Sequence, residues 1–267
     1  MLIHGAVRTD IGKVRLKNED AFGFFPDMTF YVVADGMGGH AGGEVASSLT
    51  IEIMRLSLQE TQDEDLTPIT DSEGRHSVGG RRLFIAVQRA NSKVFERSRR
   101  DPGLAGMGTT VTAVLFNDRE DLASICHVGD SRMYRVRAGH IEQLTEDDSV
   151  VQQLFREGKI GLQELKTSPH RHTLTQALGV SPIVQPAVRI EKPWQGDIFV
   201  ICSDGVHGAV EEAEILNTVT QEGLDLQKAC DTLVNLANER GGRDNSTIII
   251  LRYDHTGEEV KGDRTLT

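Results

Sequence analysis

Residues 29–40 read TFYVVADGMGGH, an apolar run that ends abruptly in an acidic, glycine-rich turn. β-Branched and aromatic residues dominate the first six positions, which predicts a strand over residues 29–34. Asp35 follows this strand directly, and Gly36 beside it lets the backbone approach a ligand closely. A carboxylate at the end of a strand is held by a rigid scaffold and can be aimed into a cleft.

The same arrangement, an acid near the end of an apolar run, recurs along the chain. Further strands are predicted over residues 109–116, 122–128, 198–202 and 247–253, with a hairpin over 132–144. The acids of interest stand beside Gly, Asn, Ser or another acid: Glu19, Asp20, Asp35, Asp130, Asp204 and Asp244. Any one of them is typical of an ordinary turn. Their number favours a divalent-cation site, because Mg²⁺ and Mn²⁺ prefer oxygen ligands and carboxylates clustered without a cation repel one another.

Helical periodicity completes the prediction of the fold. Apolar residues recur at helical spacing over residues 44–60, 81–98 and 226–236. The polar segment 61–80 is expected to be a surface loop between the first two helices. Because strands and helices are grouped without regular alternation, we predict an α+β fold with largely antiparallel sheets. We expect a single domain over residues 1–255 and a disordered tail over 256–267.

Composition excludes several classes of protein. The 40 Asp and Glu residues outnumber the 29 Lys and Arg residues, and the formal charge of −11 argues against nucleic acid as a partner. Neither a signal peptide nor an apolar run approaching the ~20 residues of a membrane span is visible, so we expect a cytoplasmic protein that binds no membrane. A monomer is expected, since the sequence has no heptad pattern. Cys126, Cys202 and Cys230 lack metal-ligand spacing and are expected to be buried thiols.

Six short motifs resemble those of the metal-dependent protein phosphatases (type 2C), in particular the bacterial branch. They follow the order of that family and read RxxNED at 15–20, VVADGMGGH at 32–40, MGTT at 107–110, VGDSR at 128–132, CSDG at 202–205 and GRDN at 242–245. The resemblance implies an αββα sandwich of two mainly antiparallel sheets flanked by helices. It also implies hydrolysis of phosphoserine and phosphothreonine by a hydroxide that bridges two Mn²⁺ or Mg²⁺ ions. The implied partners are phosphorylated proteins, including a serine/threonine kinase or its substrates.

The resemblance further implies which residues hold the cations. Asp35 would bridge the two ions, with the backbone carbonyl of Gly36 on one of them. Asp204 and Asp244 would complete the shell of the first ion. Asp130, together with Asp204, would hold a third and weaker ion.

The remaining site residues are assigned in the same way. Glu19 would hold the second ion through water, with Asp20 in the surrounding shell. Arg15 resembles the phosphate-binding arginine of the family, whose planar guanidinium suits two phosphate oxygens at once. His40 is the candidate general acid, because Met37 occupies the position that carries a histidine in eukaryotic members.

Residues from about 145 to 179 resemble the mobile flap of the family, which lies over the metals and influences substrate choice. Asp148 stands where the opening motif of the flap usually has a histidine, and Gly208 stands where many relatives have a metal-linked aspartate. Three histidines near these motifs are interpreted as ordinary polar surface residues: His170, His172 and His207.

Two alternative functions are consistent with parts of the sequence. Cys126 and Arg132 have the Cys-x5-Arg spacing of cysteine-dependent phosphatases, in which a thiolate attacks the phosphate. Asp130 between them, and the strand-like alternation after Arg132, argue against such a loop. The other alternative is a pseudophosphatase that binds phosphoprotein or metal without turnover, although no acid predicted to bind metal is missing.

Overall fold

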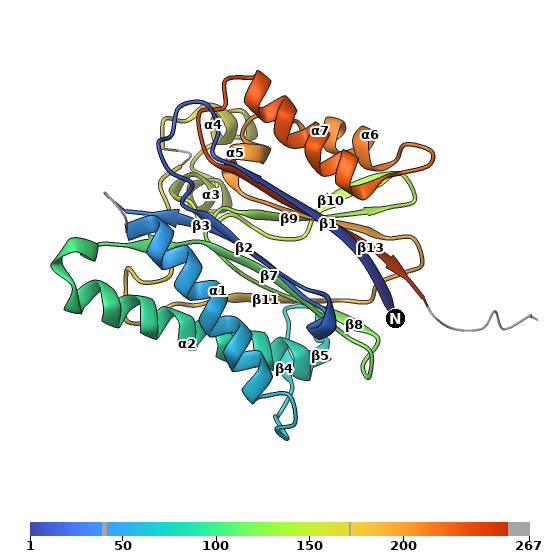
Figure 1. Ribbon diagram of the computed structural model, residues 1–267, viewed down its shortest axis with the longest axis horizontal. Helices are drawn as coiled ribbons and strands as arrows, with labels where there is room; N and C mark the ends of the chain where they lie inside the picture. The colour runs from blue at the N-terminus through green and yellow to red at the C-terminus, as the bar shows by residue number, and fades with distance from the viewer. Residues whose placement is uncertain (39–41, 171, 256–267) are drawn as a thin grey trace, which may run out of the picture.

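Two antiparallel β-sheets stack against each other, and helices cover their outer faces (Figure 1). The computed structural model describes residues 1–38, 42–170 and 172–255. His40 and the predicted tail over 256–267 lie outside these residues. The architecture confirms the predicted α+β sandwich. Among the described residues, no helix is both long and apolar enough to span a membrane.

The first sheet contains, in spatial order, β1 (Leu2–Asp10), β13 (Ser246–Asp254), β12 (Ile198–Cys202), β9 (Arg132–Arg137) and β10 (His140–Gln143). The second sheet contains β11 (Ala187–Glu191), β8 (Leu122–Val128), β7 (Val111–Asn117), β3 (Phe30–Met37) and β2 (Asp20–Phe25), with β6 (Gly108–Thr109) paired to β3. A separate short hairpin is formed by β4 (Ile69–Thr70) and β5 (His76–Ser77).

Two long helices, α1 (Gly42–Glu60) and α2 (Val78–Arg100), cover the second sheet (Figure 1). The first sheet is covered by α6 (Glu212–Val219) and α7 (Leu226–Glu239), with α5 (Asp204–His207) directly after β12. The segment between β10 and β11 contains α3 (Val150–Arg156) and α4 (Leu162–Thr167). Two short 3₁₀ helices are η1 (Pro26–Met28) and η2 (Pro102–Leu104).

The run at residues 29–34 is continuously apolar because both faces of β3 are buried. Tyr31 and Val33 pack in the core between the sheets, whereas Phe30, Val32 and Ala34 pack beneath the helices. Aromatic side chains join the two sheets within this inner core. The ring of Phe116 in β7 lies edge-to-face against that of Phe199 in β12, with centroids 5.5 Å apart.

The polar segment 61–80 differs from the predicted surface loop, because residues 69–80 contain β4, β5 and the start of α2. The side chain of Ser77 caps the helix by accepting a hydrogen bond from the N–H of Gly80 at 3.1 Å. A Cβ atom at Gly80 would lie 2.9 Å from Ile69 Cγ2. This glycine therefore allows close packing of helix and hairpin and does not end a loop.

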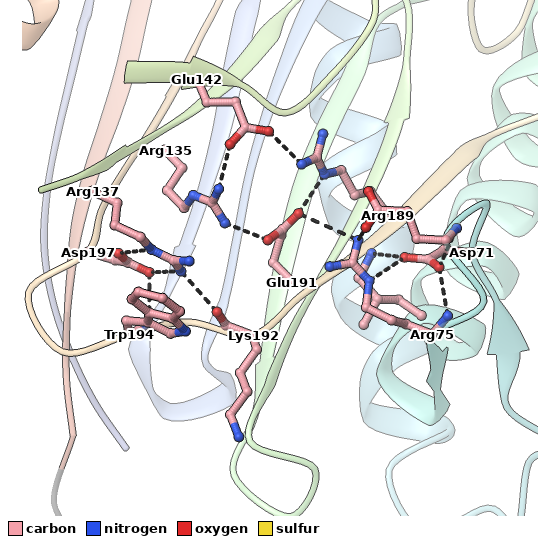
Figure 2. A network of polar contacts seen from close by, with 12 residues as sticks. Asp71, Arg75, Arg135, Arg137, Glu142, Arg189, Glu191, Lys192, Trp194 and Asp197 are labelled. Atoms are coloured by element: carbon pink, nitrogen blue, oxygen red, sulfur yellow. Dashed lines mark hydrogen bonds and ion pairs between the residues drawn. The ribbon is translucent and has the colours of Figure 1, made fainter. Parts of the chain in front are cut away.

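An ion-pair network joins the edges of the two sheets (Figure 2). Glu191 in β11 accepts hydrogen bonds of 2.6 Å from Arg189 and from Arg135 in β9, and its side chain is only 5% exposed. Glu142 in β10 accepts a hydrogen bond of 2.7 Å from Arg189. The network therefore holds β11 of the second sheet against β9 and β10 of the first.

Replacing Glu191 by Gln should destabilise the fold, because it removes the negative charge that two partly buried arginines share. We expect the free energy of unfolding to fall by about 3 kcal/mol, as when one partner of a buried ion pair is removed. Urea unfolding followed by circular dichroism measures this change. The control is Glu60→Gln, since Glu60 pairs with Arg89 on the surface and its loss should change stability little. Equal effects of the two substitutions would contradict a stabilising role for the network.

Candidate metal centre

Asp20 and Asp35 lie opposite each other on neighbouring strands, as a register pair of β2 and β3. Two threonines of the MGTT motif hold the backbone of Asp35. Its N–H donates to Thr110 Oγ1 at 2.9 Å, and its carbonyl accepts from the N–H of Thr110 at 2.8 Å and from Thr109 Oγ1 at 2.9 Å. The position of Asp35 is therefore fixed by a second segment far away in the sequence.

Three further carboxylates reach Asp35 from other strand ends. Asp130 follows β8, Asp204 follows β12 as the first residue of α5, and Asp244 precedes β13. Burial raises the pKa of Asp35 well above its ordinary value, and the negative charges of Asp20, Asp204, Asp130 and Asp244 raise it further. The structure therefore brings together five acids that the sequence placed at separate strand ends.

The acidic cluster fits a divalent cation. Asp20 Oδ2 accepts hydrogen bonds from Ser203 at 2.8 Å and Thr247 at 2.7 Å, but Asp20 Oδ1 is buried and has no hydrogen-bond partner within the described part of the chain. Burial raises the pKa of Asp20 to about 7, and burial together with the charge of Asp204 raises that of Asp130 to about 7. A cation would satisfy the unpaired oxygen and offset the repulsion, and ligands that are all oxygen suit Mg²⁺ or Mn²⁺.

Glu19 is held between α1 and β13. Its N–H donates to Asn245 Oδ1 at 2.8 Å, and its carbonyl accepts from Ser47 Oγ at 2.6 Å and from the N–H of Gly36 at 3.1 Å. A Cβ atom at Gly43 would lie 2.7 Å from Glu19 Oε2, so only glycine leaves room for this carboxylate at the start of α1. Burial is the main reason that the pKa of Glu19 is raised.

Asn245 has a positioning role that the sequence did not reveal. Besides binding the N–H of Glu19, its side-chain amide donates to the carbonyls of Ile11 at 3.0 Å and Lys17 at 2.9 Å. It therefore ties the loop over residues 11–19 to β13. The GRDN motif at 242–245 contains this asparagine, but no local pattern indicates that its amide reaches the loop over residues 11–19.

Arg15 lies in this loop at the entrance to the acidic cluster. Its Nη2 donates to Asp244 Oδ2 at 2.6 Å, and its side chain is 51% exposed. This hydrogen bond is the largest cause of the raised pKa of Arg15. The guanidinium is therefore charged, anchored at one side and accessible to an incoming anion.

Two of the three histidines interpreted as surface residues lie against the acids. His207 Nε2 is 2.9 Å from the carbonyl oxygen of Asp130, and burial lowers the pKa of His207 to about 4. His172 Nδ1 is 3.4 Å from Asp204 Oδ2. Burial alone would raise the pKa of Asp204, but the hydrogen bond from His172 helps to lower it. His170 is exposed, as predicted.

The two departures from the family motifs have different consequences. The Asp148 carboxylate accepts hydrogen bonds from the N–H of Gly129 at 2.9 Å and from Gln176 Nε2 at 2.8 Å. Asp148 therefore ties both ends of the segment 145–179 to the turn that carries Asp130. Gly208 offers only its backbone N–H, which donates to the carbonyl of Asp204 at 2.7 Å.

The alternative of a cysteine-dependent phosphatase is wrong. Cys126 is fully buried inside β8, and burial raises the pKa of its thiol to about 12, so that no thiolate forms near neutral pH. Arg132 does not face a phosphate-binding loop, because its guanidinium binds both carboxylate oxygens of Asp147 at 2.8 and 2.9 Å. All three cysteines are buried free thiols, as predicted.

Comparisons with known proteins point to one family. The family model described as Protein phosphatase 2C matches residues 13–244, a range that includes Arg15 and all six acids. Serine/threonine protein phosphatase PstP of Mycobacterium tuberculosis is 34% identical over 258 residues, which make up 96% of this chain and 46% of that relative. Serine/threonine phosphatase stp of Listeria monocytogenes is 32% identical over 257 residues, covering 95% of this chain and 97% of the relative. The chain thus spans about half the length of the first relative and nearly all of the second.

The structural comparison agrees with the sequence relatives. The catalytic domain of serine/threonine protein phosphatase PstP in complex with two manganese ions superposes on this chain with a TM-score of 0.79. The two sequences are 32% identical, and the match covers 95% of this chain and 99% of that domain.

The raised pKa values predict how the stability of the metal-free protein depends on pH. The carboxyl groups with a pKa near 7 in the folded protein bind a proton more tightly there than in the unfolded chain, and this difference stabilises the fold. The stabilisation is complete below the pKa of the unfolded chain, and it is lost as the pH rises through 7. In EDTA, lowering the pH from about 8 to about 6 should therefore increase the free energy of unfolding by on the order of 1 kcal/mol for each such group, Asp20 and Asp130. Urea unfolding at a series of pH values measures the increase.

Saturating Mn²⁺ should remove this increase, because a bound cation keeps the carboxylates ionised. In EDTA, Asp20→Asn should remove the part of the increase in unfolding free energy that Asp20 contributes. The part contributed by Asp130 should remain. An identical pH dependence with Mn²⁺ and with EDTA would show that the ion does not interact with the carboxylates of Asp20 and Asp130.

Proposed function

The chain belongs to the protein phosphatase 2C family, and we propose that it is a metal-dependent protein phosphatase acting on phosphoserine and phosphothreonine. The observation that carries this proposal is the convergence of four carboxylates, each from another strand end, around that of Asp35. Oxygen ligands in this number suit a pair of hard divalent cations.

We assign the cation ligands as the family resemblance implies them. Asp35, with Asp204 and Asp244, would hold one ion, and Glu19 would hold the second through water. The backbone carbonyl of Gly36 would bind one of the two ions, and the carboxylate of Asp20 would lie in the shell around them. The two manganese ions in the PstP catalytic domain support Mn²⁺ as the occupant. When bound, two such ions generate a nucleophile from water near neutral pH and offset charge on the phosphoryl oxygens.

Arg15 is placed to bind and orient the phosphate. Its guanidinium is half exposed at the edge of the acidic cluster, and its planar fork can donate to two phosphate oxygens at once. The hydrogen bond with Asp244 keeps the guanidinium beside the proposed ion site in the absence of the cations. His40 stays the candidate donor of a proton to the leaving oxygen, an assignment that rests on sequence alone.

The substrates would be phosphorylated proteins, among them a serine/threonine kinase or the substrates of that kinase. A role in cytoplasmic signalling, as a monomer, is proposed from composition and from the family resemblance. The intact set of acids also favours an active enzyme over a pseudophosphatase, because a binding module would have no need of all the ion ligands.

Hydrolysis of a phosphothreonine peptide should require Mn²⁺ and be abolished by EDTA. Asp35→Asn and Asp204→Asn should each lower kcat/KM by at least about 10²-fold, because each removes a charge that would hold a cation. Release of inorganic phosphate measures the rate. Cys126→Ser is the matched control and should retain full activity, since its thiol is buried and protonated.

Three results would overturn the proposal. Activity in the presence of chelator would exclude dependence on a cation. Full activity in both Asp variants would exclude the assigned ligands. An inactive protein that still binds Mn²⁺ tightly would instead support the pseudophosphatase.

Arg15→Lys should lower kcat/KM by about 10-fold, mainly through a higher KM, because lysine keeps the charge but loses the bidentate fork. Steady-state kinetics with the same peptide separates KM from kcat. Lys17→Gln is the control, since it removes a positive charge from the same loop. An unchanged KM in Arg15→Lys together with a raised KM in Lys17→Gln would indicate attraction by net charge in place of direct contact by Arg15.

A further inference from the structure

Two exposed cationic side chains stand next to the contact between Arg15 and Asp244. Lys13 precedes Arg15 by two residues in the loop over residues 11–19, and Arg243 directly precedes Asp244. Neither side chain forms an ion pair or a hydrogen bond with any residue that the structure describes. Acids outnumber Lys and Arg by 40 to 29 in this chain, so most cations can find an acidic neighbour. The charges of these two residues are therefore available to a partner from outside.

Both side chains pack against one turn, formed by Gly241 and Gly242 directly after α7 (Figure 1). The N–H of Lys13 donates to the carbonyl of Gly242 at 2.7 Å. A Cβ atom at Gly242 would lie 3.0 Å from Lys13 Cγ, and a Cβ atom at Gly241 would lie 3.7 Å from Arg243 Nε. The two glycines have φ angles of 127° and 52°, a conformation that favours glycine at both positions. The turn therefore brings the two cations together from distant parts of the sequence.

The loop that carries Lys13 and Arg15 has an anchored backbone. The N–H of Val14 donates to the carbonyl of Gly242 at 3.2 Å, next to the bond from Lys13. The side-chain amide of Asn245 binds carbonyls at both ends of the loop, at 3.0 and 2.9 Å. Because the backbone is held in this way, binding a partner through these side chains costs little ordering of the loop.

The two cations lie within reach of a peptide whose phosphate is bound by Arg15. The Cα atoms of Lys13 and Arg15 are at most about 7 Å apart, since two residues separate them along the chain. Arg243 is the direct neighbour of the residue that holds Arg15. An extended peptide advances by about 3.4 Å per residue. Residues one to three positions from the phosphorylated residue can therefore meet Lys13 and Arg243.

The other lysine of the loop, Lys17, has an acidic neighbour. Burial raises the pKa of Glu19, whereas the charges of Arg15 and Lys17 act to lower it. The charge of Lys17 is thus partly offset by Glu19, in contrast to that of Lys13. Lys17 therefore offers a matched control, since it lies in the same loop, is equally exposed to solvent and carries the same charge.

We propose that Lys13 and Arg243 bind the carboxylates of Asp and Glu residues that flank the phosphorylated residue, so that the substrates are phosphoproteins with acidic segments at the site. This inference rests on the proposed function, because it names the class of substrate for the same site. Charge complementarity selects the partner: a guanidinium and an ammonium both donate to carboxylate oxygens, and both repel a basic segment. Exposed ion pairs are individually weak, so we expect a preference of about 5-fold, mainly through KM.

Two phosphothreonine peptides that differ only in their flanking residues test the proposal. One carries Glu at the three positions on each side, and the other carries Gln there. At low salt the Mn²⁺-loaded wild type should show a KM about 5-fold lower for the Glu peptide, and about 1 M salt should remove this difference by screening. The double variant Lys13→Gln with Arg243→Gln should lose the preference, while its hydrolysis of the Gln peptide and of p-nitrophenyl phosphate stays unchanged.

Three further variants separate contact from net charge. Lys17→Gln should keep the full preference. Lys13→Arg with Arg243→Lys keeps both charges and should also keep it. Lys13→Gln alone, which lies outside the GRDN motif, should lower the preference by about 2-fold.

Equal KM values for the two peptides in the wild type, or an undiminished preference in the double variant, would overturn the proposal. An equal loss of preference in Lys17→Gln would also overturn it, since it would indicate attraction by net charge.

Binding of non-hydrolysable phosphonate analogues of the two peptides, measured by fluorescence anisotropy, separates this inference from the proposed function. Tighter binding of the Glu analogue without phosphate release from either peptide would support the contact with acidic segments and reject the proposed function. Phosphate release from both peptides with equal KM and equal binding would do the reverse.

Discussion

Asp35 lies at the end of β3 with the carboxylates of Asp20, Asp130, Asp204 and Asp244 around it, largely removed from water. Burying even one unpaired charge costs several kcal/mol, and neighbouring like charges add to the cost. The raised pKa values of Asp20 and Asp130 show how the metal-free protein responds, which is by favouring the protonated forms. The fold must therefore hold the acids together against their own repulsion, and a cation must remove that repulsion when the site is in use.

The sandwich provides the necessary rigidity. Its central strands are buried on both faces, so that the strand ends, and the acids that follow them, are held by packing on two sides. The positions of the acids also depend on hydrogen bonds from residues that carry no charge. Thr109 and Thr110 hold the backbone of Asp35, and Asn245 holds that of Glu19. Elsewhere the charged network around Glu191 joins the sheet edges (Figure 2), and there each buried acid has cationic partners within the protein.

The strands that are buried on both faces could be predicted from the sequence, since a continuous apolar run such as residues 30–34 is unambiguous. The acids that end them were equally visible as motifs.

β1, β2 and β11 were not predicted, because they are partly exposed and mix polar, glycine and apolar residues without a clear period. The start of α2 was placed too late, because Gly79 and Gly80 indicated a loop, whereas tertiary packing makes them part of a helix. The roles of Asn245 and His172 depend on contacts across more than 30 residues, and no local pattern signals such contacts.

The contact between Arg15 and Asp244 would connect the proposed cations to the phosphate group of a substrate. Asp244 Oδ2 accepts a hydrogen bond of 2.6 Å from Arg15, and the same carboxylate is assigned to the first ion. A cation on Asp244 would compete with Arg15 for the negative charge, so that binding the ion weakens the hold on the guanidinium. Arg15 would then be free to turn toward a phosphate. The same bound cations would make the charge at the acidic cluster positive instead of negative. A chain with a formal charge of −11 could in this way attract a phosphate dianion, because the positive charge of bound cations would be confined to the place where the acids converge.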